Sequence, residues 1–258
     1  MKPTKTTTKT QTELSWEQEL AQEAASASTQ VVTEAIMQEA DGNYISTAGG
    51  KMSYNKQILP DTIDVVVAAY SRENAWYATR YVAGEVTTPA CYSFAEDGKP
   101  MTPHEEAPDP QAKECSTCPK NQFGSSTTGG RGKACKNIRK LALVMFEEEA
   151  DLDYKTAYLR VPVTSGENWA KYLMSLVNEL KRPAYSVVTR ITITPHAKKQ
   201  FELTFKYVKS IESREVGEKL KELWVKEKLE LTRPYALEEP REAPKKGKAV
   251  SESNEVHY

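Results

Sequence analysis

The residues in this chain best suited to chemistry are its four cysteines, which all lie between positions 91 and 135. Cys115 and Cys118 form a CxxC pair; 23 residues separate Cys91 from the pair, and 16 residues separate the pair from Cys135. Four thiolates are a common ligand set of tetrahedral zinc, and a CxxC loop places two sulfurs around one ion with little strain. Pro119 and the glycines that follow it supply turns that could fold the other cysteines inward. The spacing predicts one four-thiolate metal site.

Two other interpretations of the cysteines stay open. Free cysteines are common in hydrophobic cores, but this segment is rich in proline and glycine and poor in apolar residues, so it has no core of its own. Four cysteines also suit an iron–sulfur cluster; we favour zinc because nothing else in the sequence indicates redox or radical chemistry. His104 lies between the first two cysteines and could replace one of them. Its surroundings, HEEAPDP, indicate a solvated acidic loop, so we expect His104 outside the ligand set.

The whole-chain composition is that of an ordinary globular protein, 39% hydrophobic and with a formal net charge of -1. This balance gives no overall signature of nucleic-acid binding, so an anionic partner would need a local patch. The N-terminus lacks the apolar stretch of a secretory signal, and no segment approaches the roughly 18 apolar residues of a membrane span. We therefore expect a cytoplasmic protein with no membrane partner, in which reduced thiols bind metal rather than form disulfides.

A local basic patch does follow the CxxC pair. The segment from Lys120 to Lys140 contains six basic residues and neither Asp nor Glu. Such groups bind phosphate backbones by releasing counterions, and glycine-rich backbone lets amides approach phosphate closely. A solvated charged surface is the plain alternative. The candidate contacts to nucleic acid are Lys120, Arg131, Lys133, Lys136, Arg139 and Lys140.

Aromatic residues favour the nucleic-acid interpretation, because single strands are held by aromatic faces that stack on bases beside basic grooves. Six aromatic residues flank or enter the cysteine segment: Trp76, Tyr77, Tyr81, Tyr92, Phe94 and Phe123. We expect about half of these to be core residues. The candidate stacking residues are Trp76, Tyr77 and Phe123. A second candidate surface is a strand face that carries Tyr158, Arg160, Arg190 and Lys206.

The remainder of the chain predicts a strand-rich α+β fold. Residues 1–13 have almost no apolar side chains and predict a disordered arm, and residues 14–40 have the Ala, Glu and Gln content of a helix. Apolar residues at helical spacing predict an amphipathic helix between Ser165, a candidate N-cap, and Lys181. A charged C-terminal helix is expected within residues 212–233, and a disordered tail at 234–258. Alternating or continuous apolar runs predict strands at residues 63–70, 141–146, 156–163, 187–194 and 201–208.

Three stretches, ACYSFAEDGKP, CSTCPKNQFGS and GRGKACKNIRKLALV, resemble a group of bacteriophage-encoded proteins identified as single-stranded DNA-binding proteins with an OB-like fold and a cysteine-rich insertion. The similarity covers about Trp16 to Tyr207. It implies an OB-like five-stranded barrel over residues 14–211 with a zinc module at 91–135. It also implies that single-stranded DNA is the ligand and that phage replication or recombination proteins are partners. More distantly, the chain is similar to the helix-destabilising proteins of T-even phages, whose zinc site includes a histidine where this chain offers a fourth cysteine.

A non-catalytic, sequence-independent single-stranded DNA-binding protein is thus the leading hypothesis. An enzyme is the second: a nuclease or recombination factor with a cysteine-bound cluster. The acidic turn at residues 147–153 could hold magnesium, although a solvated loop explains it better, and the chain has no phosphate-binding GxxxxGK[ST] loop and no HxE with PCxxC deaminase pattern. A zinc-dependent transcription regulator is the third hypothesis. It would need a recognition helix beside the metal, and the sequence places none there.

Overall fold

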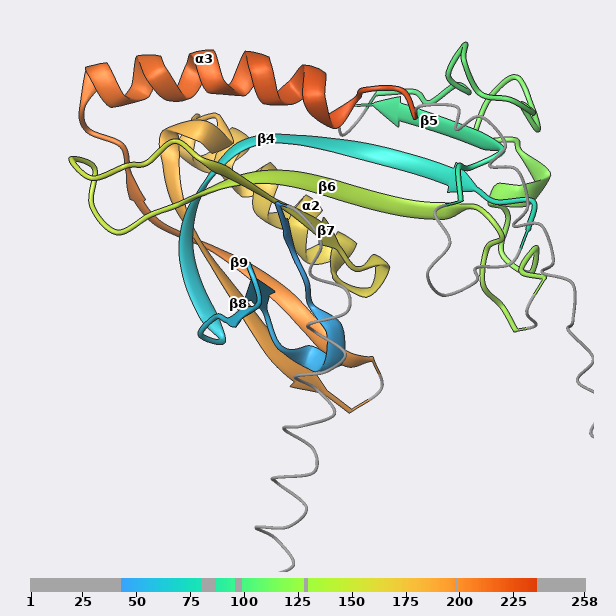
Figure 1. The fold of residues 1–258 in the computed structure, drawn as a ribbon, viewed down its shortest axis with the longest axis horizontal. Helices are drawn as coiled ribbons and strands as arrows, with labels where there is room; N and C mark the ends of the chain where they lie inside the picture. Colours follow the sequence, from blue (N-terminus) through green and yellow to red (C-terminus); the bar gives the residue numbers. More distant parts are fainter. Residues whose placement is uncertain (1–42, 80–86, 96–98, 128–129, 198, 236–258) are drawn as a thin grey trace, which may run out of the picture.

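The computed structural model describes residues 43–79, 87–95, 99–127, 130–197 and 199–235 (Figure 1). The predicted arm at 1–13, the predicted helix at 14–40 and all of the predicted tail beyond Tyr235 lie outside these residues, as does Tyr81. Within them the chain forms a strand-rich α+β fold, as the sequence predicted.

One seven-stranded sheet forms the body of the molecule, in the order β1-β7-β6-β4-β8-β9, with β5 paired to β4. The pairing of β1 with β7 is parallel and the others are antiparallel. A separate small hairpin joins β2 (Ser53–Tyr54) to β3 (Gln57–Ile58). The strands of the sheet are β1 (Tyr44–Ile45), β4 (Thr62–Trp76), β5 (Cys91–Ala95), β6 (Lys136–Met145), β7 (Thr156–Val161), β8 (Val187–His196) and β9 (Gln200–Ser210).

The five predicted strands all form, and β1 and β5 bring the sheet to seven where five were expected. The two additional strands cover only two and five residues. Segments that short carry too little alternation to be recognised, and β5 gains its strand conformation from pairing with β4.

The longest strand, β4, divides the sheet into two regions. One edge of β4 pairs with β6 from Val65 to Ala75, while on the other edge residues 62–66 pair with β8 and residues 72–76 pair with β5. A β-bulge between Val67 and Ala69 lies where the partner changes, and bulges of this kind bend a strand. The sheet therefore curls into a half-barrel at one end and continues as a long arm at the other (Figure 1).

We call the half-barrel, with β7, β8, β9 and the first half of β4, the curled region. We call the other end the arm: β5, the second half of β4, the first half of β6 and the loops at residues 99–135. The two regions differ in how they are covered, because the helices pack mainly on the curled region.

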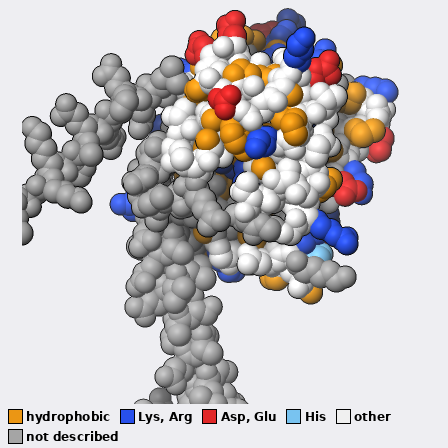
Figure 2. Space-filling view, turned by 90° about the vertical axis from the view of Figure 1, so that its right-hand side faces the viewer, with side chains coloured by type: hydrophobic (Ala, Val, Ile, Leu, Met, Phe, Trp, Pro, Cys, Tyr) orange, Lys and Arg blue, Asp and Glu red, His pale blue; other side chains and the backbone are white. Residues whose placement is uncertain are grey.

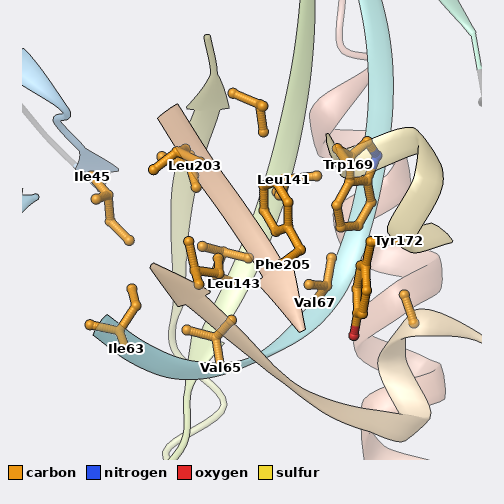
Figure 3. Packing of buried hydrophobic residues seen from close by; sticks show 14 of the residues in the cluster. Ile45, Ile63, Val65, Val67, Leu141, Leu143, Trp169, Tyr172, Leu203 and Phe205 are labelled. Carbon is orange, nitrogen blue, oxygen red and sulfur yellow. The ribbon is translucent and has the colours of Figure 1, made fainter. Parts of the chain in front are cut away.

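The concave side of the curled region is filled by α2 (Gly166–Ser175). Trp169 is fully buried there, and its ring lies edge-on to Phe205 with the ring centres 5.2 Å apart (Figure 3). The hydroxyl groups of Tyr172 and Thr189 share a buried hydrogen bond of 2.6 Å. A π-helical turn (Leu176–Leu180) continues the helix, and Lys181 ends it in the left-handed conformation. The predicted amphipathic helix is thus confirmed.

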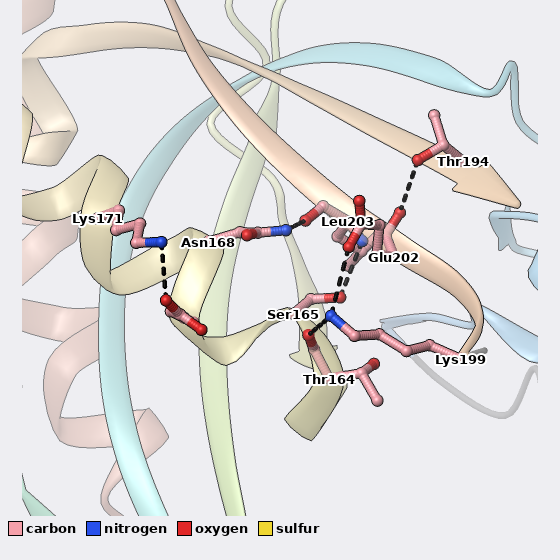
Figure 4. Close-up of polar contacts among 9 residues, drawn as sticks. Thr164, Ser165, Asn168, Lys171, Thr194, Lys199, Glu202 and Leu203 are labelled. Atoms are coloured by element: carbon pink, nitrogen blue, oxygen red, sulfur yellow. Dashed lines mark hydrogen bonds and ion pairs between the residues drawn. The ribbon is translucent and has the colours of Figure 1, made fainter. Parts of the chain in front are cut away.

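Ser165 begins this helix but does not cap it. Its hydroxyl accepts a hydrogen bond from the backbone amide of Leu203 on β9, at 2.8 Å, rather than from an amide of α2 (Figure 4). Asn168 donates to the carbonyl of the same residue at 2.9 Å. Ser165 thus occupies the predicted N-cap position, but its side chain makes no capping hydrogen bond and instead fixes α2 to the sheet.

The outer face of the sheet is covered by α3 (Arg214–Leu231), the predicted C-terminal helix. Leu220 is fully buried against Val66 and Val144. Ser213 caps this helix, its hydroxyl accepting from the amide of Val216 at 3.3 Å. The curled region is thus a sheet between two helices, each of which buries one apolar side.

Candidate metal centre and nucleic-acid interface

The four cysteines come together at the far end of the arm. All four line one cavity of about 10 Å³, together with Trp76 and other residues of β4, β5 and the loops. That volume holds about one water-sized particle. Cys91 lies on β5 directly opposite Trp76 in the sheet, and Cys135 immediately precedes β6. The sheet therefore supplies two of the thiols, and the loop at residues 99–135 supplies the CxxC pair.

Backbone hydrogen bonds hold the CxxC loop against the sheet. The amide of Cys135 donates to the carbonyl of Lys120 at 2.8 Å, and the side-chain amide of Asn121 donates to the carbonyl of Cys115 at 2.7 Å. The amide of Cys115 donates to the carbonyl of Met101 at 2.9 Å. These bonds fix the backbone at Cys115 and Cys135, whose thiols both line the cavity.

Two of the thiols, those of Cys91 and Cys135, lie in surroundings that oppose their ionisation. Burial, and then the neighbouring Cys115 and Cys118, raise the pKa of Cys135 to about 12. Burial likewise raises the pKa of Cys91. Clustered buried thiolates repel one another, and a divalent cation compensates that repulsion.

The thiols converge on the cavity without forming a closed coordination sphere. Among the residues that the structure describes, no group of three or more His, Cys, Asp or Glu side chains has the arrangement of a formed metal site. The donor set and the single-particle cavity nevertheless fit one ion that takes four sulfur ligands. His104 lies outside the cavity: its ring stacks on Tyr92 with centres 5.2 Å apart, and its Nδ1 accepts from the amide of Glu106 at 3.1 Å.

Comparison with known proteins gave no match. No protein-family model matches the chain, and searches of curated proteins and of solved structures gave no significant match. The chemistry of the site is therefore inferred from its own residues.

The loop between Cys118 and Cys135 presents an aromatic ring to solvent. Phe123 is 82% exposed, and the ammonium of Lys133 lies 4.9 Å from the centre of its ring. Ser125 organises the loop: its hydroxyl donates to the carbonyls of Lys120 and Gln122, at 2.9 and 2.6 Å, and accepts from the amide of Ala134 at 3.0 Å. Arg131 and Lys136 are exposed on the same segment.

Trp76 and Tyr77 are less accessible than the sequence suggested. Trp76 is half-buried beside the cysteine cavity, and the ammonium of Lys120 lies 4.9 Å from the centre of its ring. Tyr77 is also half-buried, and burial followed by the nearby Glu73 carboxylate raises its pKa. Of the three predicted stacking residues, only Phe123 stands free in solvent.

Two of the predicted basic contacts, Lys140 and Arg139, pack against the sheet or α2. Lys140 is buried and forms an ion pair with Glu73, so its predicted contact with nucleic acid is wrong. Arg139 lies on the opposite, concave face of β6, where its guanidinium group packs on the start of α2. A Cβ atom at Gly166 would lie 2.5 Å from a guanidinium nitrogen of Arg139. Because Gly166 has no side chain, the start of α2 leaves room for the guanidinium group of Arg139.

The second predicted surface, on the sheet itself, is not a continuous open face. Tyr158 donates from its hydroxyl to Glu227 of α3 at 2.7 Å, and Arg190 forms a bidentate ion pair with Asp64 at 2.7 and 2.8 Å. Arg160 lies on β7, with its guanidinium 5.2 Å from the ring centre of Tyr44. Lys206 is exposed on β9 opposite Arg190. Because α3 packs on β4 and β6 between β7 and β8, it separates the two pairs of residues.

The acidic turn also has a structural role. The carboxylate of Glu149 accepts from the amides of Glu212 and Ser213, at 3.1 and 3.0 Å, and these bonds lower its pKa. Asp153 pairs with Lys155 at 2.9 Å. The turn therefore anchors the residues just before α3, and the suggested magnesium site has no support in this arrangement. No helix in the described ranges is long and apolar enough to cross a membrane.

Sequence reasoning missed one polar cluster, formed by Glu73, Lys140 and Tyr235. The available signal was a glutamate inside the strand β4, whose other residues are largely apolar or small. A charge in such a run needs a buried partner. The contact of Tyr235 with Glu73 could not be predicted from the sequence, because the two residues are 162 positions apart.

Figure 2 views the molecule from the side at which the arm ends in Figure 1. Hydrophobic side chains lie on this surface among basic and acidic ones. The mixed surface is consistent with electrostatic contacts combined with stacking, rather than with a purely apolar interface.

Proposed function

We propose that this protein is a non-catalytic, sequence-independent single-stranded DNA-binding protein. The binding element is the basic loop between Cys118 and Cys135, and the observation that carries the proposal is the 82% exposure of Phe123 within that loop. An exposed aromatic ring beside basic side chains offers a face on which a nucleic-acid base can stack. A base that stacks on Phe123 would cover the ring, and Lys133 and Arg131 would meet the phosphates beside it.

We propose that the cysteine site binds zinc. If the protein contains an iron–sulfur cluster instead, the zinc assignment is wrong. Cys91, Cys115, Cys118 and Cys135 would hold the ion, which would cross-link β5, the CxxC loop and the start of β6. The metal would have no catalytic role in this scheme. It would fix both ends of the basic loop and so reduce the entropy lost when the loop binds a strand.

The architecture supports the same proposal. We interpret the curled region as an OB-like barrel and residues 91–135 as its zinc insertion. OB-folds are a common framework for single-strand binding. The resemblance in the cysteine segment extends the proposal to a role in phage DNA replication or recombination, with proteins of those processes as partners.

A gel-shift series with single-stranded DNA, duplex DNA and RNA tests the proposal, using wild type and Phe123→Ala. Removing the ring should cost about 1–3 kcal/mol of single-strand binding and leave the melting temperature unchanged. Met174→Ala is the matched control, since Met174 is an apolar side chain 62% exposed on α2. If the two variants bind equally well, Phe123 is not the platform. Magnesium-dependent cleavage of the DNA would show an enzyme instead.

A further inference from the structure

The strand β5 presents two different surfaces. Cys91 and Ser93 share the face of Trp76 and Asn74, and both line the cysteine cavity. Tyr92 and Phe94 alternate with them and point to the outer face, on which α3 lies. One short strand therefore carries a proposed metal ligand on one side and an aromatic pair on the other.

The aromatic pair holds Tyr235, which lies four residues beyond the end of α3. The ring of Tyr235 meets Tyr92 edge-on with centres 5.0 Å apart, and it stacks near-parallel to Phe94 at 6.2 Å. The ammonium of Lys140 lies 5.4 Å from the ring centres of both Phe94 and Tyr235. An aromatic side chain from the C-terminal end of the fold is thus enclosed by residues of the arm.

A buried carboxylate fixes the position of this ring. The hydroxyl of Tyr235 donates to Oε1 of Glu73, and Lys140 forms an ion pair with Oε2 of the same group. Glu73 is only 1% exposed. A buried charge is tolerated only when its hydrogen bonds are made. Tyr235 therefore supplies a hydrogen bond that the buried carboxylate of Glu73 needs. Glu73 lies directly opposite Phe94 in the pairing of β4 with β5.

We infer that Tyr235 is a positioning residue for the cysteine site. Its docking on Tyr92 and Phe94 holds β5 against β4, and the backbone of β5 carries Cys91. A bound ion would hold the same strand from the other side. This inference rests on the proposed metal site. It implies that metal binding stabilises the docking of Tyr235 and that this docking strengthens metal binding.

Coupling of this kind is reciprocal. If docking of Tyr235 strengthens metal binding by some factor, metal binding strengthens docking by the same factor. Residues outside the ligands that orient a metal site typically change its affinity by about 10- to 100-fold when they are removed. The effect of Tyr235 docking on metal affinity and the effect of metal on Tyr235 docking can be measured separately, so each measurement checks the other.

The test compares the zinc affinity of full-length wild type, Tyr235→Ala and Tyr235→Phe by competition with a chromophoric chelator. We expect roughly tenfold weaker binding for Tyr235→Ala and a partial rescue by Tyr235→Phe, which keeps the ring contacts but leaves Oε1 of Glu73 without its hydrogen bond. The control is Leu220→Ala, which destabilises α3 from a buried position far along the helix from Tyr235. The cobalt-substituted spectrum should change in Tyr235→Ala and stay that of wild type in Leu220→Ala.

Three results would overturn the inference: unchanged zinc affinity in Tyr235→Ala, an equal loss in Leu220→Ala, or no rescue by Tyr235→Phe. If Tyr235→Ala does not fold, hydrogen exchange of wild type decides. The amides of Thr232, Arg233 and Tyr235 should exchange more slowly with zinc than without it, and equal rates would refute the coupling. A wild-type protein that binds no zinc would instead refute the metal site on which the inference rests.

Discussion

In the curled region, Trp169 and Tyr172 fill the space between α2 and a sheet whose inner side chains are almost all apolar, whereas the arm has no comparable core in the part of the chain that the structure describes. The arm is held by backbone pairing, by the buried pair of Glu73 and Lys140, and by the hydrogen-bonded loops around the cysteines. The comparison indicates a division of labour. Apolar burial stabilises the curled region, whereas polar contacts and the proposed metal would shape the arm, which is the region proposed to bind DNA.

The largest effect on this comparison should come from Trp169→Ala. The ring is fully buried in the curled region, and removing it should lower the free energy of unfolding by about 3–5 kcal/mol. Chemical denaturation with far-ultraviolet circular dichroism measures the loss. Zinc affinity of the folded variant should remain that of wild type, because the cavity lined by the cysteines lies in the arm. If the zinc affinity of the folded variant falls together with its free energy of unfolding, the cysteine site depends on the core of the curled region.

A slightly smaller effect should follow from Lys140→Met in the arm. This change leaves Glu73 buried without its ion-pair partner, which typically costs roughly 3 kcal/mol or more unless the carboxylate becomes protonated. The double variant Glu73→Gln/Lys140→Met removes both charges and should recover most of that stability. Denaturant titrations of the single and double variants provide the comparison. A double variant as unstable as the single one would refute the role of the pair.

The smallest effect should come from Glu149, which anchors the two residues before α3. Glu149 has a lowered pKa because it accepts two backbone amides, so its contribution is present above its ordinary pKa of about 4.5 and is lost as the pH falls below that value. Glu149→Gln should therefore cost no more than about 1 kcal/mol at pH 7. The difference from wild type should shrink as the pH falls through the lowered pKa of Glu149 and disappear once that carboxylate is protonated. A difference that persists unchanged in acid would mean that the charge of Glu149 is irrelevant.

The sequence predicted the curled region better than the arm, and the reason is physical. Periodic apolar residues specify strands and helices that bury one face, so β4, β6, β7, β8, β9, α2 and α3 could all be expected. The convergence of the cysteines could be expected from their spacing. The pairing of Lys140 with Glu73 and the docking of Tyr235 could not, because they depend on which distant strands and termini meet. The same limit applies to Tyr158 and Arg190, whose partners lie on other elements.

The most direct test of the account is the salt dependence of single-stranded DNA binding by a loop variant in which Arg131, Lys133 and Lys136 are replaced by Ser. A control variant replaces three exposed basic residues on α2 and α3 in the same way: Lys171, Arg214 and Lys219. We predict weaker binding by the loop variant and a salt slope reduced by roughly 0.7–1 for each phosphate that the protein no longer neutralises. Zinc content and melting temperature should stay the same. If the loop variant and the control variant bind with the affinity and slope of wild type, the loop does not bind DNA and the central claim is wrong.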